Sequence, residues 1–366
     1  MKIAIVIDIY NDSGNGTTMS ARHFVQQLED KGNEVVILCQ GDKKGQNGNI
    51  YNFETKRIPL YQKVCEEQHA ILAEPDDALI NKALEGVDVV HIYLPFWLGT
   101  RTAKIAKAKG IPVLSCYHIS AENITYNAGF RHIPFSEDIV YEVLKKIHFR
   151  DDIIGDIYCP SQCMADRIVD AGYTQNIHVI SNGYNTKFRQ MNVEKPEEFK
   201  DKVVITSVGR LTREKRQDVI IKAIGKSEYK DKIVLILAGR GAKQKSYQKL
   251  ADKYGVNIKF VFLSQDELVK TLNYSDLFIQ ASDVETESIS CLEAIACGTV
   301  PIISNARMCA TKQFALDNNS LFDKGDSKDL AKHIDFWLSN PVLLKSMRNN
   351  YAESAKKYSL EKSIVI

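Results

Sequence analysis

Three glutamates stand within one short stretch of the chain, SDVETESISCLEAIACG at residues 282–298. Glu285, Glu287 and Glu293 lie at the start of a segment of small and apolar residues that is otherwise typical of a buried helix. On one continuous helix, Glu285 and Glu293 would lie about 12 Å apart along the axis. Two carboxylates that act as acid and base on one bond need a separation of about 5–9.5 Å. The spacing therefore disfavours a hydrolytic pair unless the chain bends between them.

A helix start is predicted between these carboxylates. Ser290 and Glu293 fit a capping box, with Ser290 as the N-cap and Glu293 at the third helical position. The helix would then begin near residue 291, after a loop at residues 285–289. Two roles stay open for Glu293: it accepts a hydrogen bond from the amide of Ser290, or it accepts hydrogen bonds from sugar or ribose hydroxyls. The free amides of the helix N-terminus would favour an anion such as phosphate.

A basic stretch follows a predicted buried strand, in the sequence VGRLTREKRQD at residues 208–218. Its cations are Arg210, Arg213, Lys215 and Arg216. A solvated basic turn would explain these residues if they stood alone. Considered together with the carboxylate loop, they favour a diphosphate ligand, because Arg and Lys complement the spread charge of phosphates.

A glycine-rich loop follows the first predicted strand, in the sequence NDSGNGTT at residues 11–18. It is not a dinucleotide fingerprint, because Met19 stands where the third glycine should follow Gly14 and Gly16. A Walker lysine is also missing. The loop is still able to approach a ligand closely, although this signal alone is weak.

Two series of alternating strands and helices must position these residues. The first series has predicted strands at 3–9, 34–38, 87–92, 113–117, 156–159 and 178–180. After a polar linker, the second has strands at 203–208, 233–238, 258–263, 276–280 and 299–303. Buried strands that alternate with helices predict parallel sheets covered on both faces. The expected fold class is α/β, with two doubly wound units that bind ligands at the carboxyl ends of their strands.

Bulk properties limit the class of protein. A length of 366 residues favours two domains, and 44% hydrophobic with 26% charged residues is typical of globular proteins. The net charge of +2 disfavours nucleic acid as a partner. Eight scattered cysteines predict free thiols in a reducing compartment, since the Cys159–Cys163 pair has no second Cys/His pair near it to complete a zinc site. Without about 20 consecutive apolar residues, the protein is expected in the cytoplasm, at most on the inner face of the cell membrane.

Together these features resemble the retaining glycosyltransferases of the GT-B architecture, specifically family 4, over essentially the whole chain. The most specific marker is Glu285-x7-Glu293 followed by AIACGTVP at residues 294–301, close to the family's E-x7-E-A-x-A-x-G-x-P run. VGRLTREK at residues 208–215 matches a second marker, and SNG at residues 181–183 matches the interdomain turn.

The resemblance implies two Rossmann-like domains that face each other across a cleft. Residues 1–185 would form the acceptor-side domain, and residues 186–345 would bind the nucleotide sugar. Residues 346–366 would form a C-terminal helix that crosses back to the first domain.

Roles for individual side chains are implied by the same resemblance. Arg210 and Lys215 would bind the donor diphosphate and stabilise the leaving group. Glu293 would bind the ribose hydroxyls, and Glu285 would face the hydroxyls of the donor sugar. His118 matches the family's active-site histidine near the sugar, although a lone histidine after a strand is about as often structural.

Backbone groups are implied as well. The amides of Ser288 and Ile289 would add to the phosphate cradle, and Gly239 lies in a glycine loop near the nucleotide. Gly14 and Gly16 occupy the place of the family's paired glycines. The resemblance implies no metal and no cofactor, with the nucleotide diphosphate sugar as co-substrate.

Two departures from the family pattern are present. Thr286-Glu287-Ser288 stands where the family usually has Gly-Phe-Gly, and Asn15 splits the N-terminal glycine pair. Glu287 is therefore expected to place an extra carboxylate near the sugar or the phosphate. This departure leaves the identity of the donor open.

The expected reaction is retaining transfer of a hexose from a nucleotide diphosphate sugar, with UDP-sugars favoured, to a hydroxyl of a membrane lipid or cell-envelope saccharide. Aromatic residues in HIYLPFWLG at residues 91–99 are expected to be exposed on the acceptor side. The amphipathic segment 137–150 either lies on an anionic membrane surface or packs on its sheet, with its terminal cations favouring the helix dipole. Two alternatives stay open: an epimerase that hydrolyses the nucleotide sugar, and a catalytically silent sugar-nucleotide-binding module.

Overall fold

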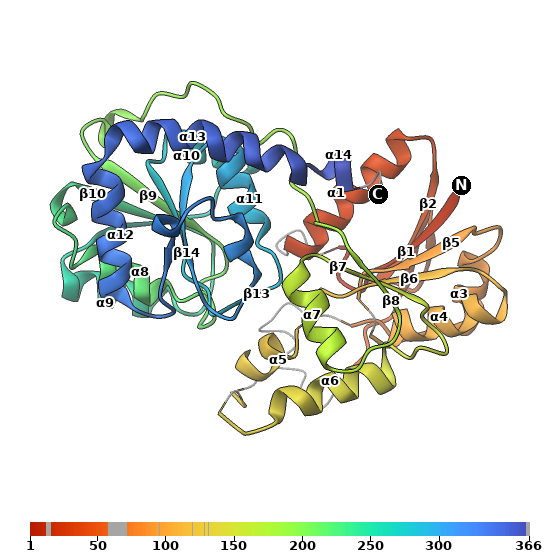
Figure 1. Cartoon of the computed structure of the whole chain (residues 1–366). Coiled ribbons are helices and arrows are strands. Elements are labelled where there is room, and N and C mark those ends of the chain that lie inside the picture. The colour runs from red at the N-terminus through yellow and green to blue at the C-terminus, as the bar shows by residue number, and fades with distance from the viewer. Residues whose placement is uncertain are drawn as a thin grey trace. The chain divides into compact units, whose positions relative to one another are not determined.

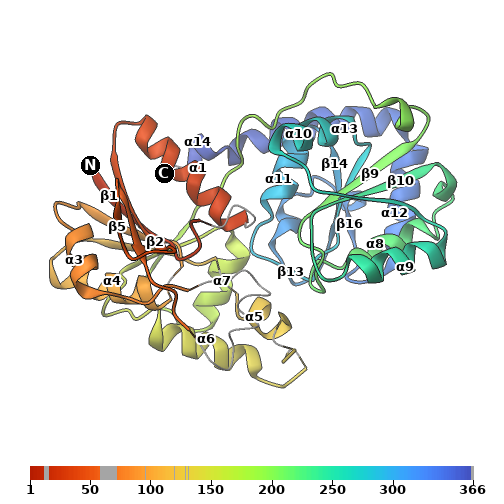
Figure 2. The ribbon, with the colours of Figure 1, turned by 180° about the vertical axis from the view of Figure 1, so that it is seen from behind.

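The computed structural model describes residues 1–11, 16–57, 72–94, 96–118, 120–127, 129–130 and 132–363. The chain divides into two compact units, and the described residues of the first lie within Met1–Ser181. The second unit is Asn182–Ser363. Each unit is an α/β structure built on a largely parallel sheet, so the predicted fold class is confirmed (Figures 1 and 2).

The first unit contains an eight-stranded sheet with the order β3-β4-β2-β1-β5-β6-β7-β8. Its strands are β1 (Lys2–Val6), β2 (Glu34–Gln40), β3 (Gly45–Asn47), β4 (Ile50–Phe53), β5 (Val89–Ile92), β6 (Val113–Cys116), β7 (Asp156–Cys159) and β8 (Asn176–Val179). All neighbours pair in parallel except β3 and β4. Its helices are α1 (Gly16–Asp30), α3 (Asp77–Ala83), α4 (Trp97–Ala108), α5 (Ala121–Asn127), α6 (Ser136–Ile147) and α7 (Gln162–Asp170).

Strand β1 shows why this sheet is covered on both faces. Alternate side chains of a strand point to opposite faces. Ala4 and Val6 belong to one buried cluster, whereas Ile3 and Ile5 belong to another. A strand that is buried on both faces has a continuous apolar sequence. This pattern is the one that predicted β1.

The second unit contains a six-stranded parallel sheet with the order β11-β10-β9-β12-β14-β16 and a two-stranded sheet of β13 and β15. Its strands are β9 (Val203–Val208), β10 (Ile233–Ala238), β11 (Asn257–Val261), β12 (Leu277–Gln280), β13 (Val284–Glu285), β14 (Val300–Ser304), β15 (Met308–Cys309) and β16 (Leu321–Phe322). Its helices are α8 (Gln217–Ile224), α9 (Gln244–Tyr254), α10 (Gln265–Tyr274), α11 (Ile289–Ala296), α12 (Ser327–Ser339), α13 (Pro341–Ala355) and α14 (Leu360–Ser363).

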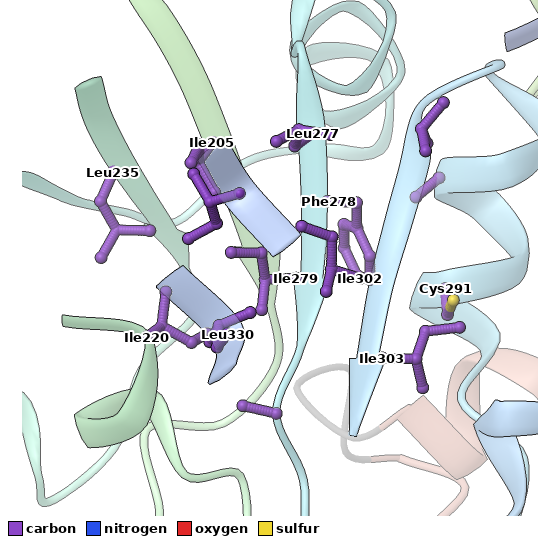
Figure 3. Close-up of a cluster of buried hydrophobic side chains, with 14 of the residues drawn as sticks. Ile205, Ile220, Leu235, Leu277, Phe278, Ile279, Cys291, Ile302, Ile303 and Leu330 are labelled. Carbon is purple, nitrogen blue, oxygen red and sulfur yellow. The ribbon is translucent and has the colours of Figure 1, made fainter. Parts of the chain in front are cut away.

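Figure 3 shows part of this unit's core, where side chains of the central strands pack against α8, α11 and α12. Phe278 and Ile302, on neighbouring strands, are fully buried there, as is Cys291 from α11. Every residue of β10 is buried as well. The apolar strands and the buried faces of these helices therefore form one continuous core.

Strand order determines where each sheet opens. In the second unit the chain runs from β9 to β10 and β11 on one side, and then returns to β12 on the other. In the first unit the order reverses in the same way between β1 and β5. Doubly wound sheets bind ligands outside the carboxyl ends of the strands at such a reversal. The loops after β9 and β12, and those after β1 and β5, are therefore the positions to inspect.

The C-terminal segment belongs to the second unit as far as it is described. Tyr351 of α13 is fully buried in that unit's core. Residues 364–366 lie outside the described residues, so the predicted crossing to the first unit stays a prediction. No described helix is both long and apolar enough to cross a membrane.

Candidate functional site

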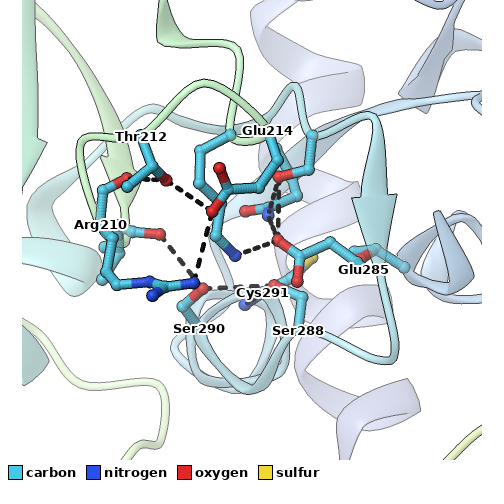
Figure 4. Close-up of polar contacts among 12 residues, drawn as sticks. Arg210, Thr212, Glu214, Glu285, Ser288, Ser290 and Cys291 are labelled. Atoms are coloured by element: carbon cyan, nitrogen blue, oxygen red, sulfur yellow. Dashed lines mark hydrogen bonds and ion pairs between the residues drawn. The ribbon is translucent and has the colours of Figure 1, made fainter. Parts of the chain in front are cut away.

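The strand reversal in the second unit brings the two predicted polar loops together. The basic loop follows β9, and the carboxylate loop follows β12 and leads into α11 (Figure 4). The hydroxyl of Ser290, in the first turn of α11, donates to the backbone carbonyl of Val208 at the end of β9, at 3.4 Å. Residues about eighty positions apart in sequence therefore line one edge of the sheet.

Lys215 and Glu285 form an ion pair at this edge. The stem of Lys215 runs over the backbone of Gly209, where a Cβ atom would lie 3.7 Å from Cε of the lysine. Gln280 and Ser282 also donate to Glu285 Oε1, at 2.5 and 2.9 Å. Three donors thus converge on one carboxylate oxygen, and no described residue donates to the other oxygen.

The backbone on either side of Glu285 is also held. Residues Val284 and Glu285 form β13, which pairs with β15. The side chain of Glu285 is 10% exposed, so both backbone and side chain are fixed at the surface of the core. This position has no capping role, as the sequence indicated.

Arg210 extends from the basic loop toward solvent. One of its Nη atoms lies 3.4 Å from Glu214 Oε1, which also accepts from the hydroxyl of Thr212 at 2.6 Å (Figure 4). Glu214 is 1% exposed, whereas the side chain of Arg210 is half exposed. Arg216 has a different role: it binds the buried carboxylate of Asp283 at 3.0 Å and is part of the structure of the loop.

The predicted capping box at Ser290 and Glu293 is wrong. Ser288 is the N-cap of α11, and its hydroxyl accepts from the amide of Cys291 at 3.4 Å. Its backbone is left-handed, with φ of 81°. The helix therefore starts two residues earlier than predicted, which places Ser288 and Ile289 at its amino end, where amides are available to an anion.

Glu293 lies on α11 with no hydrogen bond to its carboxylate from any described residue. Burial raises the pKa of this carboxyl to about 8. A half-buried acid without a protein partner is not explained by helix capping. Of the two roles left open by the sequence, the capping role is excluded because Ser288 is the N-cap, and contact with ribose hydroxyls stays a prediction.

Gly239 follows β10 in the next loop along the sheet. A Cβ atom at this position would lie 2.0 Å from the carbonyl oxygen of Gly209, and its φ is 153°. Any side chain would therefore collide with the backbone of the basic loop. The adjacent Arg240 places its guanidinium 4.0 Å from the ring centre of Phe262, which is 61% exposed. Sequence reasoning missed this stacked pair, because nothing local links the ends of β10 and β11.

Glu287 is not directed at the predicted sugar or phosphate. Its side chain is 1% exposed, and Oε2 accepts from the backbone amide of Asn182 at 2.9 Å. Asn182 is the first residue of the second unit. The expectation of an extra carboxylate near the donor is therefore corrected: Glu287 holds the segment that enters this unit.

In the first unit, His118 follows β6 and stacks on Tyr93, with ring centres 5.5 Å apart. Its Nε2 atom is buried and has no hydrogen-bond partner among the residues that the structure describes, and burial lowers the pKa of the imidazole to about 4. His91 also contacts the ring of Tyr93, with ring centres 4.9 Å apart, and its Nε2 lies 2.8 Å from the sulfur of Cys116. Tyr93 is 2% exposed, so the expectation that this aromatic faces solvent is wrong, whereas Trp97 is 39% exposed.

The glycine-rich loop is only partly described. Gly16 is the first residue of α1, whereas Gly14 lies outside the described residues. Of the eight cysteines, the seven that are described are free thiols. Among the described residues, no three His, Cys, Asp or Glu side chains lie together as ligands of a metal ion would.

Known proteins resemble both halves of the chain. Residues 14–188 match the model of Glycosyltransferase Family 4, and residues 188–358 match that of Glycosyl transferases group 1. An alpha-monoglucosyldiacylglycerol synthase of Acholeplasma laidlawii is 24% identical over 99% of this chain and 94% of its own length. A GDP-mannose-dependent alpha-mannosyltransferase of Corynebacterium glutamicum is 26% identical over 83% of this chain and 72% of its own length.

A solved structure with the same fold is HepE of Anabaena, in complex with UDP and glucose. It is 16% identical and covers 99% of this chain and 97% of its own, with a TM-score of 0.74. Together the two family models cover residues 14–358. The chain therefore belongs to the group 1 glycosyltransferases, and its fold is GT-B.

Proposed function

We propose that the protein is a retaining hexosyltransferase that uses a nucleotide diphosphate sugar, with UDP-sugars favoured, and glycosylates a membrane lipid or cell-envelope saccharide. The observation that carries this proposal is the ion pair of Lys215 and Glu285 beside the amino end of α11. A cation, a carboxylate and free helix amides at one edge suit a ligand that has both phosphates and hydroxyls.

In the proposed reaction, the bond between the sugar's anomeric carbon and the diphosphate oxygen breaks while the acceptor hydroxyl attacks from the same face. The acceptor's proton passes to the departing phosphate oxygen. Lys215, Arg210 and the amides of Ser288 and Ile289 stabilise the negative charge that grows on the phosphate. Donors of this kind, fixed in advance, are each worth about 2.7–4 kcal/mol.

Carboxylates in the site have separate tasks. Glu285 Oε1 already accepts from Lys215, Gln280 and Ser282, which leaves Oε2 to accept from a hydroxyl of the donor sugar. Glu293, without a described partner, binds the ribose hydroxyls. The flat Arg240–Phe262 pair offers a stacking surface for the base. His118 enters as a neutral imidazole at neutral pH, because its pKa is lowered to about 4.

The names of relatives support the substrate classes. One relative glucosylates a diacylglycerol lipid, another depends on GDP-mannose, and the HepE structure contains UDP and glucose. The proposed lipid acceptor is based on the name of the first relative. The nucleotide base differs between the other two proteins, which are named with GDP and UDP. We favour UDP because the lipid-modifying relative is named for a glucosyl product and the HepE structure contains glucose together with UDP.

A thermal-shift panel tests the donor. UDP-, GDP- and ADP-sugars and their nucleotide diphosphates are added with and without EDTA, and ligand binding to the folded state raises the melting temperature. We expect a shift with UDP ligands that EDTA does not change, since no metal is proposed. Hydrogen exchange should then slow in residues 209–216, 239–241 and 285–293. No shift with any nucleotide would contradict the proposal, and nucleotide release without an acceptor would favour an epimerase.

A further inference from the structure

A buried carboxylate lies within the basic loop, among the cations proposed to bind the diphosphate. Glu214 is 1% exposed, and its Oε1 accepts from the hydroxyl of Thr212 at 2.6 Å and from Nη2 of Arg210 at 3.4 Å (Figure 4). Its Oε2 is buried as well, and no described residue donates to it. The proposed contacts to the nucleotide sugar do not include Glu214, so the presence of a buried acid here needs an explanation.

Stability of the fold does not explain this acid. Moving a carboxylate out of water costs free energy, and a buried ion pair is often no more stabilising than a well-packed apolar side chain of similar volume. The pair is also incomplete, because the side chain of Arg210 is 48% exposed and Oε2 of Glu214 has no described donor. An apolar residue of the same length would fill the position at lower cost. We therefore look for a function of the charge.

The backbone of Arg210 is held by contacts of its own. The buried Gln217 donates from its side-chain amide to the carbonyl of Arg210 at 2.9 Å, and the amide of Thr212 donates to the same oxygen at 3.0 Å. The next residue, Leu211, donates to the carbonyl of Arg240 at 2.9 Å. These bonds fix where the side chain of Arg210 begins. They do not fix its guanidinium, because an arginine side chain has many rotamers.

Glu214 is a rigid partner for that guanidinium. A side chain in a close-packed interior has little freedom to change its rotamer. The backbone carbonyl of Glu214 also accepts from the amide of Asp283 at 2.9 Å, and the buried carboxylate of Asp283 is bound by Arg216 at 3.0 Å. Asp283 lies two residues before Glu285 in the carboxylate loop. Glu214 therefore connects the head group of Arg210 to the loop that contains Glu285.

We propose that Glu214 is a positioning residue, which directs the guanidinium of Arg210 toward the departing diphosphate without contacting the donor. This inference rests on the proposed function, in which Arg210 stabilises the charge that grows on the phosphate. Hydrogen-bond donors that are fixed in advance stabilise a transition state without reorganising during the reaction. A guanidinium has several N–H groups, so a bond to Glu214 is compatible with bonds to phosphate oxygens.

Glu214→Met tests this role, because methionine has a similar length and no carboxylate. We expect kcat to fall about 10–10²-fold, since a misplaced guanidinium stabilises the transition state less well. KM for the donor should change by less than about threefold, because loss of an interaction made in the transition state lowers kcat and kcat/KM equally. The melting temperature should stay close to that of the wild type, since the half-exposed Arg210 can be solvated by water.

Two further variants separate aim from general loosening of the loop. Glu214→Gln keeps an oxygen that can accept from Arg210 and Thr212, so its kcat should stay within about threefold of the wild type. Thr212→Val is the matched control, because it removes the other donor to Oε1 and keeps the contact between Arg210 and Glu214. Its kcat should also stay within about threefold of the wild type, whereas a loosened loop would lower kcat in all three variants.

A double-mutant cycle shows whether Glu214 acts through Arg210. The four proteins are the wild type, Glu214→Met, Arg210→Ala and the double variant. Residues that act as a unit have non-additive effects. We expect Glu214→Met to lower kcat by less than about twofold once Arg210 is alanine. The same fold loss in both backgrounds would mean that Glu214 acts independently of Arg210 and would overturn the proposal.

Nuclear magnetic resonance of the Arg210 side chain gives a measurement that needs no turnover. Its Nε–Hε signal is assigned with Arg210→Lys, and its order parameter reports motion on the picosecond-to-nanosecond timescale. We expect an ordered group in the wild type and a mobile one in Glu214→Met. The signal of Arg216, which binds Asp283, is the internal control and should not change.

Two more results would contradict positioning: wild-type kcat in Glu214→Met, and an Arg210 signal that stays ordered in that variant. Failure of the proposed function is distinguishable, because the wild type would then neither bind UDP nor turn over any nucleotide sugar. In that case the Arg210 signal decides alone. Lost order in Glu214→Met would support positioning of Arg210 by Glu214, and retained order would contradict it.

Discussion

Glu285 is bound through one oxygen, and this asymmetry is what makes it suitable for a substrate contact. Lys215, Gln280 and Ser282 converge on Oε1, which fixes the plane of the carboxylate while Oε2 stays available. Lys215 in turn is held by its ion pair with Glu285, at the position where the proposed diphosphate would need a cation. The pair is therefore ordered before any ligand arrives, which is the condition for electrostatic stabilisation of a transition state.

Replacement of Lys215 by alanine tests this ordering. We expect kcat/KM to fall about 10²–10³-fold, because a cation fixed beside the leaving group is lost. The melting temperature should also fall, since Glu285 loses its charge partner, although Gln280 and Ser282 still donate to it. Lys222→Ala is the control, because among the described residues Lys222 pairs with Asp218 of the same helix, α8, and not with Glu285. Turnover of Lys215→Ala within about threefold of the control would contradict the assignment.

Glu293 gives a prediction about pH and stability. Burial raises its pKa from 4.5 to about 8, so between these pH values the folded protein keeps a proton that the unfolded chain has released. Stability must therefore fall as pH rises through this window. Glu293→Gln carries no such charge and should be more stable than the wild type at pH 9, by up to about 5 kcal/mol and by less where solvent reaches the half-buried side chain, but equal to it near pH 4.

Differential scanning calorimetry at the two pH values measures this difference. Glu197→Gln serves as the control, because the side chain of Glu197 is 87% exposed in a 3-10 turn and should follow the wild type at both pH values. A stability difference between Glu293→Gln and the wild type that stays constant with pH would show that Glu293 ionises as an ordinary surface acid.

At the scale of elements, buried strands were the most predictable feature. The bounds predicted for β9 and β10 are those observed, because a strand buried on both faces is a continuous apolar run. The short polar hairpin of β3 and β4 and the two-residue pair of β13 and β15 were missed. Strands this short have no periodicity to detect, and their pairing depends on the rest of the fold.

The start of α11 shows the limit of local rules. Ser290 and Glu293 satisfy the capping-box pattern, yet Ser288 caps the helix from a left-handed backbone. The side chain of Ser290 is engaged with Val208, which is distant in sequence, so tertiary contacts decide between two similar serines. The loop that contains Ser288 and Ser290 was predictable from its motif, whereas the partner of each serine was not.

The contact of Gly239 with Gly209 yields a prediction about the loops. Gly239→Ala places a methyl group within 2.0 Å of a backbone carbonyl, so the loops after β9 and β10 must move apart. We expect a loss of at least about 1–3 kcal/mol in the free energy of unfolding and much weaker nucleotide binding. Gly155→Ala is the control, because a Cβ atom there meets nothing within 4 Å. Unchanged nucleotide affinity in Gly239→Ala would contradict the close approach.

At the scale of the whole molecule, each unit has its own core, and the functional features divide between them. The second unit carries the groups proposed to bind the nucleotide sugar, whereas His118 lies in the first. The chain passes from one unit to the other at Ser181 and Asn182. The contacts that hold the chain at Ser181 and Asn182 are therefore relevant to both parts of the proposed function, donor binding and acceptor binding.

Glu287 holds the passage through the amide of Asn182, a contact between residues 105 positions apart. In Glu287→Ala this acceptor is lost, so the Asn182 amide should exchange with deuterium at least about tenfold faster. Glu287→Gln keeps an acceptor oxygen of the same length and should keep the amide protected. Hydrogen-exchange mass spectrometry measures both variants, with the Met191 amide, which donates to Asn273 at 2.6 Å, as an internal control.

Equal exchange of Asn182 in wild type and Glu287→Ala would show that the carboxylate does not restrain this segment. Faster exchange at Met191 as well would indicate general destabilisation, which a lower melting temperature would reveal. If only Asn182 responds, the residue that departs from the family pattern acts on the connection between the units. This structural role would then explain why position 287, beside the proposed donor loop, is a glutamate.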